Sequence, residues 1–288
     1  MERWPNFFII GAPRSGTTLL HNYLKQIPGI FMSSVKEPSY FAISINPKQK
    51  LTKPIHDKKK YLKLFEKAKY DDAVGESTPS YLWDPQAAKL IHQVVPDAKI
   101  IMILRNPVER AYSHYLQGIG FGYETLPLQE AMKKSLNSPN DYSNRITAAG
   151  FYSEQVKRYL NIFKKEQLKI FIFEEFIQDL EKSVGEILDF LGVHSEIPSS
   201  LKMVQNPVDI SPGRFSKFLI RNKALRTIVR ELVPYERSLE IRKIFSKKTE
   251  KPPLSDDDKK FLEDIYRQDV KKLQQILSRN LPWPVAKN

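Results

Sequence analysis

The sequence predicts an α/β fold, a three-layer arrangement in which a central parallel sheet is flanked by helices, followed by a helical C-terminal region. Two observations support this prediction. Short apolar runs alternate with segments of helical periodicity up to residue 195, as expected for parallel strands buried on both faces. After Ser195 the pattern is helical only. We therefore expect one domain over 1–288, with an α/β core at 1–195 and a helical, basic C-terminal part at 196–288.

The individual elements follow from the local pattern. Strands are expected where apolar runs are short and uninterrupted, at 7–10, 30–32, 73–76, 99–104 and 168–173. Helices are expected where apolar residues recur every three or four positions: at 17–26, 58–67, 85–95, from Asn106-Pro107 onward, 152–163 and 176–191. Pro85 suits the first turn of its helix, where a missing N–H costs nothing.

Composition narrows the classes of function. The formal net charge of +13 favours anionic partners such as nucleotides, acidic glycans, nucleic acid or a lipid surface. The chain has no cysteine, and its histidines show no metal-ligand spacing; disulfides and thiol chemistry are therefore excluded, and no metal is expected. No apolar run is long enough for a signal peptide or a membrane span, so we expect a soluble, cytoplasmic protein.

The first polar cluster is a glycine loop between the first strand and the first helix, Gly11-Ala12-Pro13-Arg14-Ser15-Gly16-Thr17-Thr18. Glycines let the backbone approach a phosphate, and the helix N-terminus presents free N–H groups. The spacing of the two glycines matches the start of a Walker A loop, so the predicted fold is P-loop-like, yet Thr17 stands where that motif requires lysine. This favours a donor whose reactive group is attached to a 5′-phosphate, with Arg14 as the neutralising cation.

The second cluster follows the strand at 99–104 and reads Arg105-Asn106-Pro107-Val108-Glu109-Arg110-Ala111-Tyr112-Ser113. An arginine fork and a hydroxyl two helical turns further on can share one phosphate. Taken alone, Arg105 could equally be the partner of a structural ion pair.

Two more clusters follow predicted strands and suit an acceptor. The segment 35–41 contains Lys36 and Glu37, and a carboxylate within reach of a hydroxyl can take its proton. The segment 75–83 offers Ser77 and Tyr81, hydroxyls and aromatics of the kind that contact sugars. Each has a purely structural alternative: a solvated Glu37 paired with Lys36, and an ordinary turn.

At these residues the sequence resembles the sulfotransferase superfamily, particularly the branch with heparan sulfate, tyrosylprotein and many bacterial sulfotransferases. Residues 11–18 look like its 5′-phosphosulfate loop, and 105–113 resemble its 3′-phosphate motif. The segment 36–41 is similar to the one that carries the general base in the heparan sulfate branch. The resemblance spans nearly the whole chain, because Gly150-Phe151-Tyr152, 266–270 and 281–283 also look like family landmarks.

The resemblance implies a one-step transfer of the sulfuryl group from 3′-phosphoadenosine 5′-phosphosulfate (PAPS) to a hydroxyl of a carbohydrate, glycolipid or other hydroxylated metabolite. The product nucleotide is 3′-phosphoadenosine 5′-phosphate (PAP), and no metal is required. Glu37 and Arg14 would be catalytic. The donor would contact Arg14, Ser15, Gly16, Thr17, Thr18, Arg105 and Ser113, and the acceptor would contact Lys36, Ser77 and Tyr81.

The chain departs from the heparan sulfate enzymes at two positions. Arg14 stands where they place a lysine, and it still neutralises charge although it does not easily give up a proton. Ser77 stands where they often have a lysine, which argues against a heparan sulfate acceptor.

Two other classes of protein are the alternatives. A P-loop kinase or NTPase needs a lysine at 17 and a magnesium-holding aspartate at a strand end, whereas the strand at 99–104 is followed by Arg105. A nucleic-acid-binding protein rests on charge alone and leaves the glycine loop unexplained, so no nucleic acid partner is expected.

Two histidines near the motifs are expected to pack rather than react. His114 could be proposed as the base, but it lies about 100° around the helix from Ser113. His21, on the first helix, is interpreted in the same way.

The stretch 214–251 holds 12 Lys/Arg against 4 Asp/Glu among apolar residues. Three interpretations are open: it holds a polyanionic acceptor, it makes a peripheral contact with an anionic membrane, or it forms an amphipathic cap on the core, which is the interpretation favoured.

Overall fold

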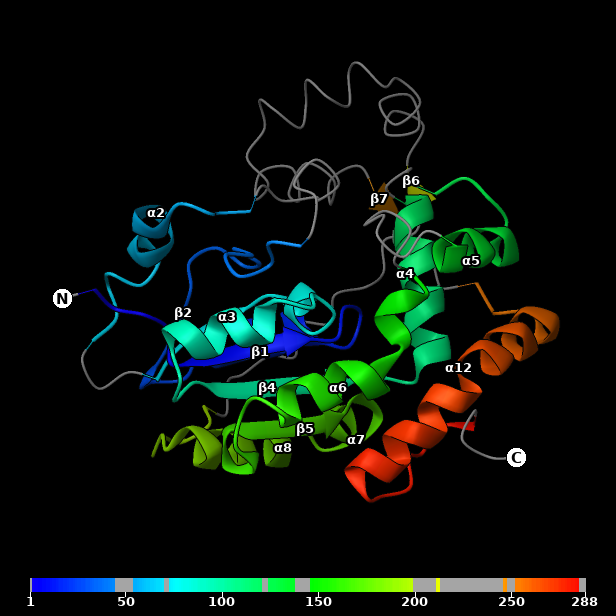
Figure 1. The fold of residues 1–288 in the computed structure, drawn as a ribbon. Helices are drawn as coiled ribbons and strands as arrows, with labels where there is room; N and C mark the ends of the chain where they lie inside the picture. Colours follow the sequence, from blue (N-terminus) through cyan, green and yellow to red (C-terminus); the bar gives the residue numbers. More distant parts are fainter. Residues whose placement is uncertain are drawn as a thin grey trace, which may run out of the picture.

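The structure, a computed structural model, describes residues 2–44, 54–69, 73–120, 124–137, 146–198, 211–212, 246–247 and 252–284. A five-stranded sheet forms its centre, with the strand order β2-β3-β1-β4-β5 (Figure 1). All neighbouring strands are parallel, which confirms the predicted α/β class. The strands are β1 (Phe7–Gly11), β2 (Ile30–Met32), β3 (Ala73–Ser77), β4 (Lys99–Leu104) and β5 (Leu168–Ile172).

Helices cover both faces of the sheet. They are α1 (Thr17–Leu24), α2 (Lys58–Lys63), α3 (Ala87–Val94), α4 (Pro107–Gly120), α5 (Leu128–Asn137), α6 (Tyr152–Leu160), α7 (Phe173–Gln178), α8 (Leu180–Leu191) and α12 (Asp256–Leu277). Short 3₁₀ turns lie at η2 (Pro79–Tyr81), η4 (Ala148–Gly150) and η5 (Lys165–Gln167). The helix α5 was not among the elements predicted from the sequence.

The alternation of side chains along β1 divides the core in two. Phe7 and Ile9 pack with α1 and α8 on one face, while Phe8 and Ile10 pack with α3, α6 and α12 on the other. All four side chains are fully buried, and a buried side chain of this size contributes about 1.5–3 kcal/mol to stability. The uninterrupted apolar run of β1 is therefore explained by burial on both faces.

The structure corrects the sequence prediction at several points. The expected helix 176–191 is two helices, α7 and α8, because the Asp179 side chain accepts from the backbone N of Lys182 at 3.0 Å and caps α8. The prediction of helices only after Ser195 is wrong, since β6 (Ser211–Pro212) pairs antiparallel with β7 (Ser246–Lys247). Apart from the backbone of β7, the basic stretch 214–251 lies outside the described residues.

The C-terminal helix α12 closes the second face by binding the start of α6. The Asp269 carboxylate accepts from the backbone N of Tyr152 at 2.7 Å and of Ser153 at 3.2 Å, so it satisfies two of the free N–H groups at the start of α6. A Cβ on Gly150 would lie 2.8 Å from the Tyr266 ring. These contacts explain why a glycine before α6 accompanies the segment 266–270.

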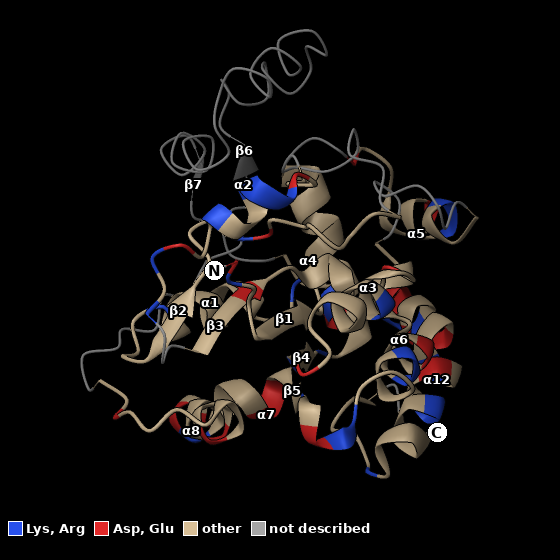
Figure 2. Ribbon diagram, turned by 60° about the vertical axis from the view of Figure 1, so that its left-hand side comes forward, with Lys and Arg blue, Asp and Glu red and all other residues tan. Residues whose placement is uncertain are grey.

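Charged side chains are distributed unevenly over the helices (Figure 2). Four of the six residues of α2 are lysine, whereas α8 mixes both signs. Among the described residues, the structure has no helix long and apolar enough to cross a membrane.

Candidate active site

The polar clusters predicted from the sequence meet at the carboxyl end of the central strand. From β1 the chain runs to β2 at the edge of the sheet, returns through β3 on one side of β1, and crosses to β4 on the other side. The loops therefore diverge on either side of β1, which is where α/β sheets of this kind bind ligands.

The glycine loop leads from β1 directly into α1. Gly16 is the N-cap of α1 with φ 81°, a left-handed conformation that glycine adopts without strain. Arg14 is also left-handed, with φ 68°, which is uncommon for a residue with a Cβ and is found most often where function requires it. Thr17 is buried at the start of α1 and Thr18 is half-buried beside it. The hydroxyl of Ser15 is fully buried and has no hydrogen-bond partner among the described residues.

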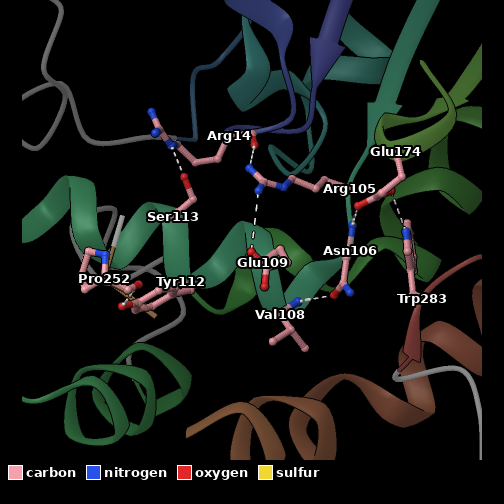
Figure 3. A network of polar contacts seen from close by, with 10 residues as sticks. All are labelled: Arg14, Arg105, Asn106, Val108, Glu109, Tyr112, Ser113, Glu174, Pro252 and Trp283. Carbon is pink, nitrogen blue, oxygen red and sulfur yellow. Dashed lines mark hydrogen bonds and ion pairs between the residues drawn. The ribbon is translucent and has the colours of Figure 1, made fainter. Parts of the chain in front are cut away.

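The first and second motifs are joined by side-chain contacts (Figure 3). Arg14 Nε donates to Ser113 Oγ at 3.0 Å across a separation of 99 residues. Arg105 Nη1 donates to the backbone O of Arg14 at 3.1 Å. Two guanidinium groups and a hydroxyl are thus held next to the start of α1, and this arrangement can bind phosphate or sulfate oxygens.

The guanidinium of Arg105 lies over the aromatic ring of Phe173. This group lies 4.9 Å from the centre of the ring, and Arg105 Nη2 lies 3.8 Å from Glu109 Oε2. The same ring limits the glycine loop, because a Cβ on Gly16 would lie 3.0 Å from Phe173. The Phe173 ring therefore lies close to both motifs.

Glu174 connects the second motif to the C-terminal segment. Its Oε1 accepts from the backbone N of Asn106 at 3.0 Å, and its Oε2 accepts from Trp283 Nε1 at 2.9 Å (Figure 3). Asn106 Oδ1 in turn accepts from the backbone N of Val108 at 3.0 Å at the start of α4. Sequence reasoning missed Phe173 and Glu174, although their place at the end of β5, on the same edge of the sheet, was a usable signal.

Positive charge accumulates around the glycine loop. Burial, followed by the charges of Arg105 and Arg110, lowers the pKa of the Arg14 guanidinium to about 10. Burial likewise lowers the pKa of Arg105. Both groups remain cationic near neutral pH, and a bound polyanion would relieve their mutual repulsion.

The two histidines are neutral near pH 7. Burial, followed by the charges of Arg110 and Arg14, holds the pKa of His114 well below its ordinary value, and its Nδ1 lies 3.2 Å from Arg110 Nη1. Burial, followed by Lys36, lowers the pKa of His21 to about 4. Arg110 therefore donates to the imidazole of His114, an arrangement that agrees with the expected packing role.

The loop after β2 carries Lys36 and Glu37 on the other side of β1. Lys36 Nζ lies 2.7 Å from Glu37 Oε1, and the backbone N of Glu37 donates to the backbone O of Ser77 at 3.0 Å. Glu37 is half-buried and left-handed, with φ 61°. Ser77 is fully buried, and its hydroxyl has no partner among the described residues.

Tyr81 differs from the other acceptor candidates. It is fully buried; its hydroxyl donates to Glu76 Oε1 at 2.8 Å and accepts from the backbone N of Phe41 at 3.3 Å. The hydroxyl is therefore engaged inside the protein, which argues against the acceptor contact expected from the sequence.

Comparison with known proteins agrees with this geometry. Residues 5–274 match the family model described as "Sulfotransferase domain". A solved sulfotransferase from Alicyclobacillus acidocaldarius is 28% identical, with a TM-score of 0.73, covering 97% of this chain and 98% of that one.

Two curated relatives show similar identity over part of their length. Mouse carbohydrate sulfotransferase 15 is 26% identical, over 66% of this chain and 44% of its own length. Human heparan sulfate glucosamine 3-O-sulfotransferase 6 is 26% identical, over 67% of this chain and 53% of its own length. The chain thus spans about half the length of these relatives. Since the family model covers nearly all of the chain, the protein belongs to the sulfotransferase domain family, whose co-substrate is PAPS.

Proposed function

We propose that this protein transfers the sulfuryl group of PAPS to an acceptor hydroxyl. The observation that carries the proposal is the joining of two anion-binding motifs through Arg14, Ser113 and Arg105. PAPS bears phosphate on both the 3′ and 5′ positions, so it needs two such motifs next to each other. A γ-phosphate enzyme would need a lysine where Thr17 stands.

The residues near the loop suit the two ends of the donor. On the 5′ side, Arg14 and the N–H groups at the start of α1 provide positive charge, and the unpartnered hydroxyl of Ser15 is a further donor. On the 3′ side, Arg105 offers a guanidinium fork and Ser113 a hydroxyl. We assign the donor contacts to Arg14, Ser15, Gly16, Thr17, Thr18, Arg105 and Ser113.

Glu37 is proposed as the general base. Its carboxylate takes the proton of the acceptor hydroxyl as the new O–S bond forms and the bond between sulfur and the 5′-phosphate oxygen breaks, releasing PAP. The rate gain comes from positioning and from charge neutralisation by Arg14, as in phosphoryl transfer. Lys36 keeps Glu37 in place at 2.7 Å.

The acceptor is proposed to be a hydroxyl of a carbohydrate, glycolipid or other hydroxylated metabolite, with Lys36 and Ser77 on its side of the site. Relatives named for carbohydrate and heparan sulfate support a glycan, while Ser77 in place of a lysine argues against heparan sulfate itself. The stretch 214–251, outside the described residues, stays a predicted contact for a polyanion, an anionic membrane or the core.

Nucleotide selectivity tests the donor assignment. PAP at saturating concentration should raise the melting temperature, and ATP should leave it unchanged, because only PAP offers a 3′-phosphate to Arg105. Equal stabilisation by ATP would favour the kinase or NTPase alternative.

Transfer itself is tested with ³⁵S-labelled PAPS and separate acceptors: chondroitin, desulfated heparosan, a galactolipid and a simple alcohol. Label should move to at least one hydroxyl compound and depend on Glu37. Label that appears only on amines would contradict transfer to oxygen.

A further inference from the structure

A buried carboxylate, Glu76, lies behind the loop that carries Glu37. It is fully buried and accepts hydrogen bonds from the hydroxyls of Tyr61 at 2.6 Å, Thr78 at 2.5 Å and Tyr81 at 2.8 Å. Two of these donors approach Oε1 and the third approaches Oε2. Buried carboxylates are uncommon unless such donors satisfy them, and Glu76 has no place in the donor site described above.

Two of the three hydroxyls extend the contact to the backbone of the base loop. Thr78 Oγ1 accepts from the backbone N of Ser39 at 3.3 Å, and the Tyr81 hydroxyl accepts from the backbone N of Phe41 at 3.3 Å. Ser39 Oγ donates back to the carbonyl of Glu37 at 3.1 Å. Hydrogen bonds therefore link Glu76, through Thr78 and Ser39, to the backbone carbonyl of Glu37.

The direction of these bonds depends on the carboxylate. A hydroxyl has one proton; if it points at Glu76, the oxygen is left free to accept from a loop N–H. An amide in place of the carboxylate would present N–H groups to one of the hydroxyls and force that hydroxyl to turn. The proton of that hydroxyl would then lose its acceptor, and a proton turned toward the loop would oppose the loop N–H, at the cost of an unsatisfied buried group.

The loop needs such support because its backbone is strained. Glu37 and Ser39 both have positive φ, 61° and 59°, a conformation that costs free energy for residues with a Cβ and persists where surrounding contacts fix it. Burial, together with the negative charge of Glu76, raises the pKa of Tyr61 and Tyr81, so both tyrosines keep the protons that they donate.

We infer that Glu76 is a positioning residue for the transfer reaction: acting through Thr78 and Tyr81, it holds the backbone of 37–41 so that the Glu37 carboxylate faces the acceptor hydroxyl. This inference rests on the proposed function of Glu37. It also gives Tyr81 a role different from the acceptor contact expected from the sequence.

The chain offers a matched control for this inference. Tyr61→Phe removes one donor to Glu76 but no bond to the loop backbone, and it keeps the ring that stacks on Tyr40 at 4.3 Å. Thr78→Val and Tyr81→Phe each remove one donor and one loop contact. Glu76→Gln replaces one of the two accepting oxygens of the carboxylate with an NH₂ group, which donates.

Amide hydrogen exchange tests the structural half without an acceptor. The Ser39 amide should exchange about 10-fold faster in Thr78→Val, the Phe41 amide in Tyr81→Phe, and at least one of the two in Glu76→Gln. Neither should change in Tyr61→Phe. Equal protection in all four variants would overturn the inference, whatever the role of Glu37.

Hydrolysis of ³⁵S-labelled PAPS, with water as the acceptor, tests the functional half. Thr78→Val and Tyr81→Phe should lower kcat about 10-fold, while calorimetric affinity for PAP stays within about 2-fold of the wild type. Tyr61→Phe should keep kcat within about 2-fold. A loss in Tyr61→Phe as large as in Thr78→Val would show that the cluster supports the fold only.

A double-variant cycle separates this inference from the base assignment. If Glu76 acts through Glu37, Thr78→Val should lower kcat no further in a Glu37→Gln background. Additive losses would overturn the positioning role. Normal turnover of Glu37→Gln alone would instead contradict the proposed base, and the exchange data would still decide whether the cluster holds the loop.

Discussion

The proposed donor side and the proposed acceptor side of the site are built in different ways. On the donor side, charged and polar side chains from distant motifs touch one another directly, as Arg14 does with Ser113 at 3.0 Å. On the proposed acceptor side, Lys36 is the side chain that contacts the Glu37 carboxylate, at 2.7 Å, and buried hydroxyls hold the backbone of the Glu37 loop. The donor nucleotide has a fixed chemistry, so the residues that bind it form recognisable motifs. The acceptor varies, so its side of the site is a loop without such a motif.

The largest expected effect follows from removing the charge of Arg14 on the proposed donor side. Arg14→Ala should lower kcat by about 10²-fold or more, because it removes the charge next to the leaving phosphate. Arg14→Lys is the matched control and should lose much less, since it keeps the charge and gives up the bond to Ser113. Steady-state rates at saturating donor measure both, and equal losses would show that geometry outweighs charge.

The matching test on the acceptor side is Glu37→Gln. It should lower turnover by about 10²-fold at saturating acceptor, because the amide cannot take the hydroxyl proton. Affinity for PAP should stay unchanged if the two sides are as separate as the contacts indicate. Glu154→Gln, on the exposed face of α6, is the control, and near wild-type turnover of Glu37→Gln would refute the base assignment.

A smaller effect compares how much Arg105 and Ser113 each contribute to binding of PAP. Arg105→Ala should weaken calorimetric binding of PAP about 10- to 100-fold, because it removes a cation that can donate two hydrogen bonds to the phosphate, and Ser113→Ala only about 10-fold, because it removes a single hydroxyl donor. Unchanged affinity in Arg105→Ala would remove it from the 3′-phosphate site.

The last effect concerns stability rather than activity: His21 lies on α1, and burial, followed by the charge of Lys36, lowers its pKa. Its pKa is about 4 in the folded protein and about 6.5 when unfolded, so the unfolded chain binds the extra proton between these values. Its contribution to the free energy of unfolding is complete above pH about 6.5 and falls toward pH 4 by at most about 1.4 kcal/mol per pH unit. Urea unfolding should show a shallower decline in His21→Leu, and an identical pH dependence would contradict this.

The fold was largely predictable from the sequence because burial on both faces gives continuous apolar runs. The strand at 99–104 was predicted residue for residue, since Lys99 and Arg105 bound an apolar segment. The break at Asp179 was not predictable, because the apolar period continues across a single capping side chain. The basic stretch 214–251 remains a prediction.

The sequence predicted the part of the site in which the residue type itself indicates the role, such as an arginine beside an anion. Arg14 and Ser113 were expected in one donor site, and the structure places them in contact. The burial of Tyr81 could not be predicted, because tyrosine serves equally well at a surface or beneath one. Glu174 was missed because its contacts to Asn106 and Trp283 lie 68 and 109 positions away.

The bond between Glu174 and Trp283 has a consequence for biosynthesis. Arg105 and the glycine loop are synthesised early. The backbone N of Asn106, next to Arg105, donates to Glu174, and Glu174 can accept from Trp283 only after residue 283 has been synthesised. The support that Glu174 gives to the segment after β4 is therefore complete only after residue 283 has been synthesised.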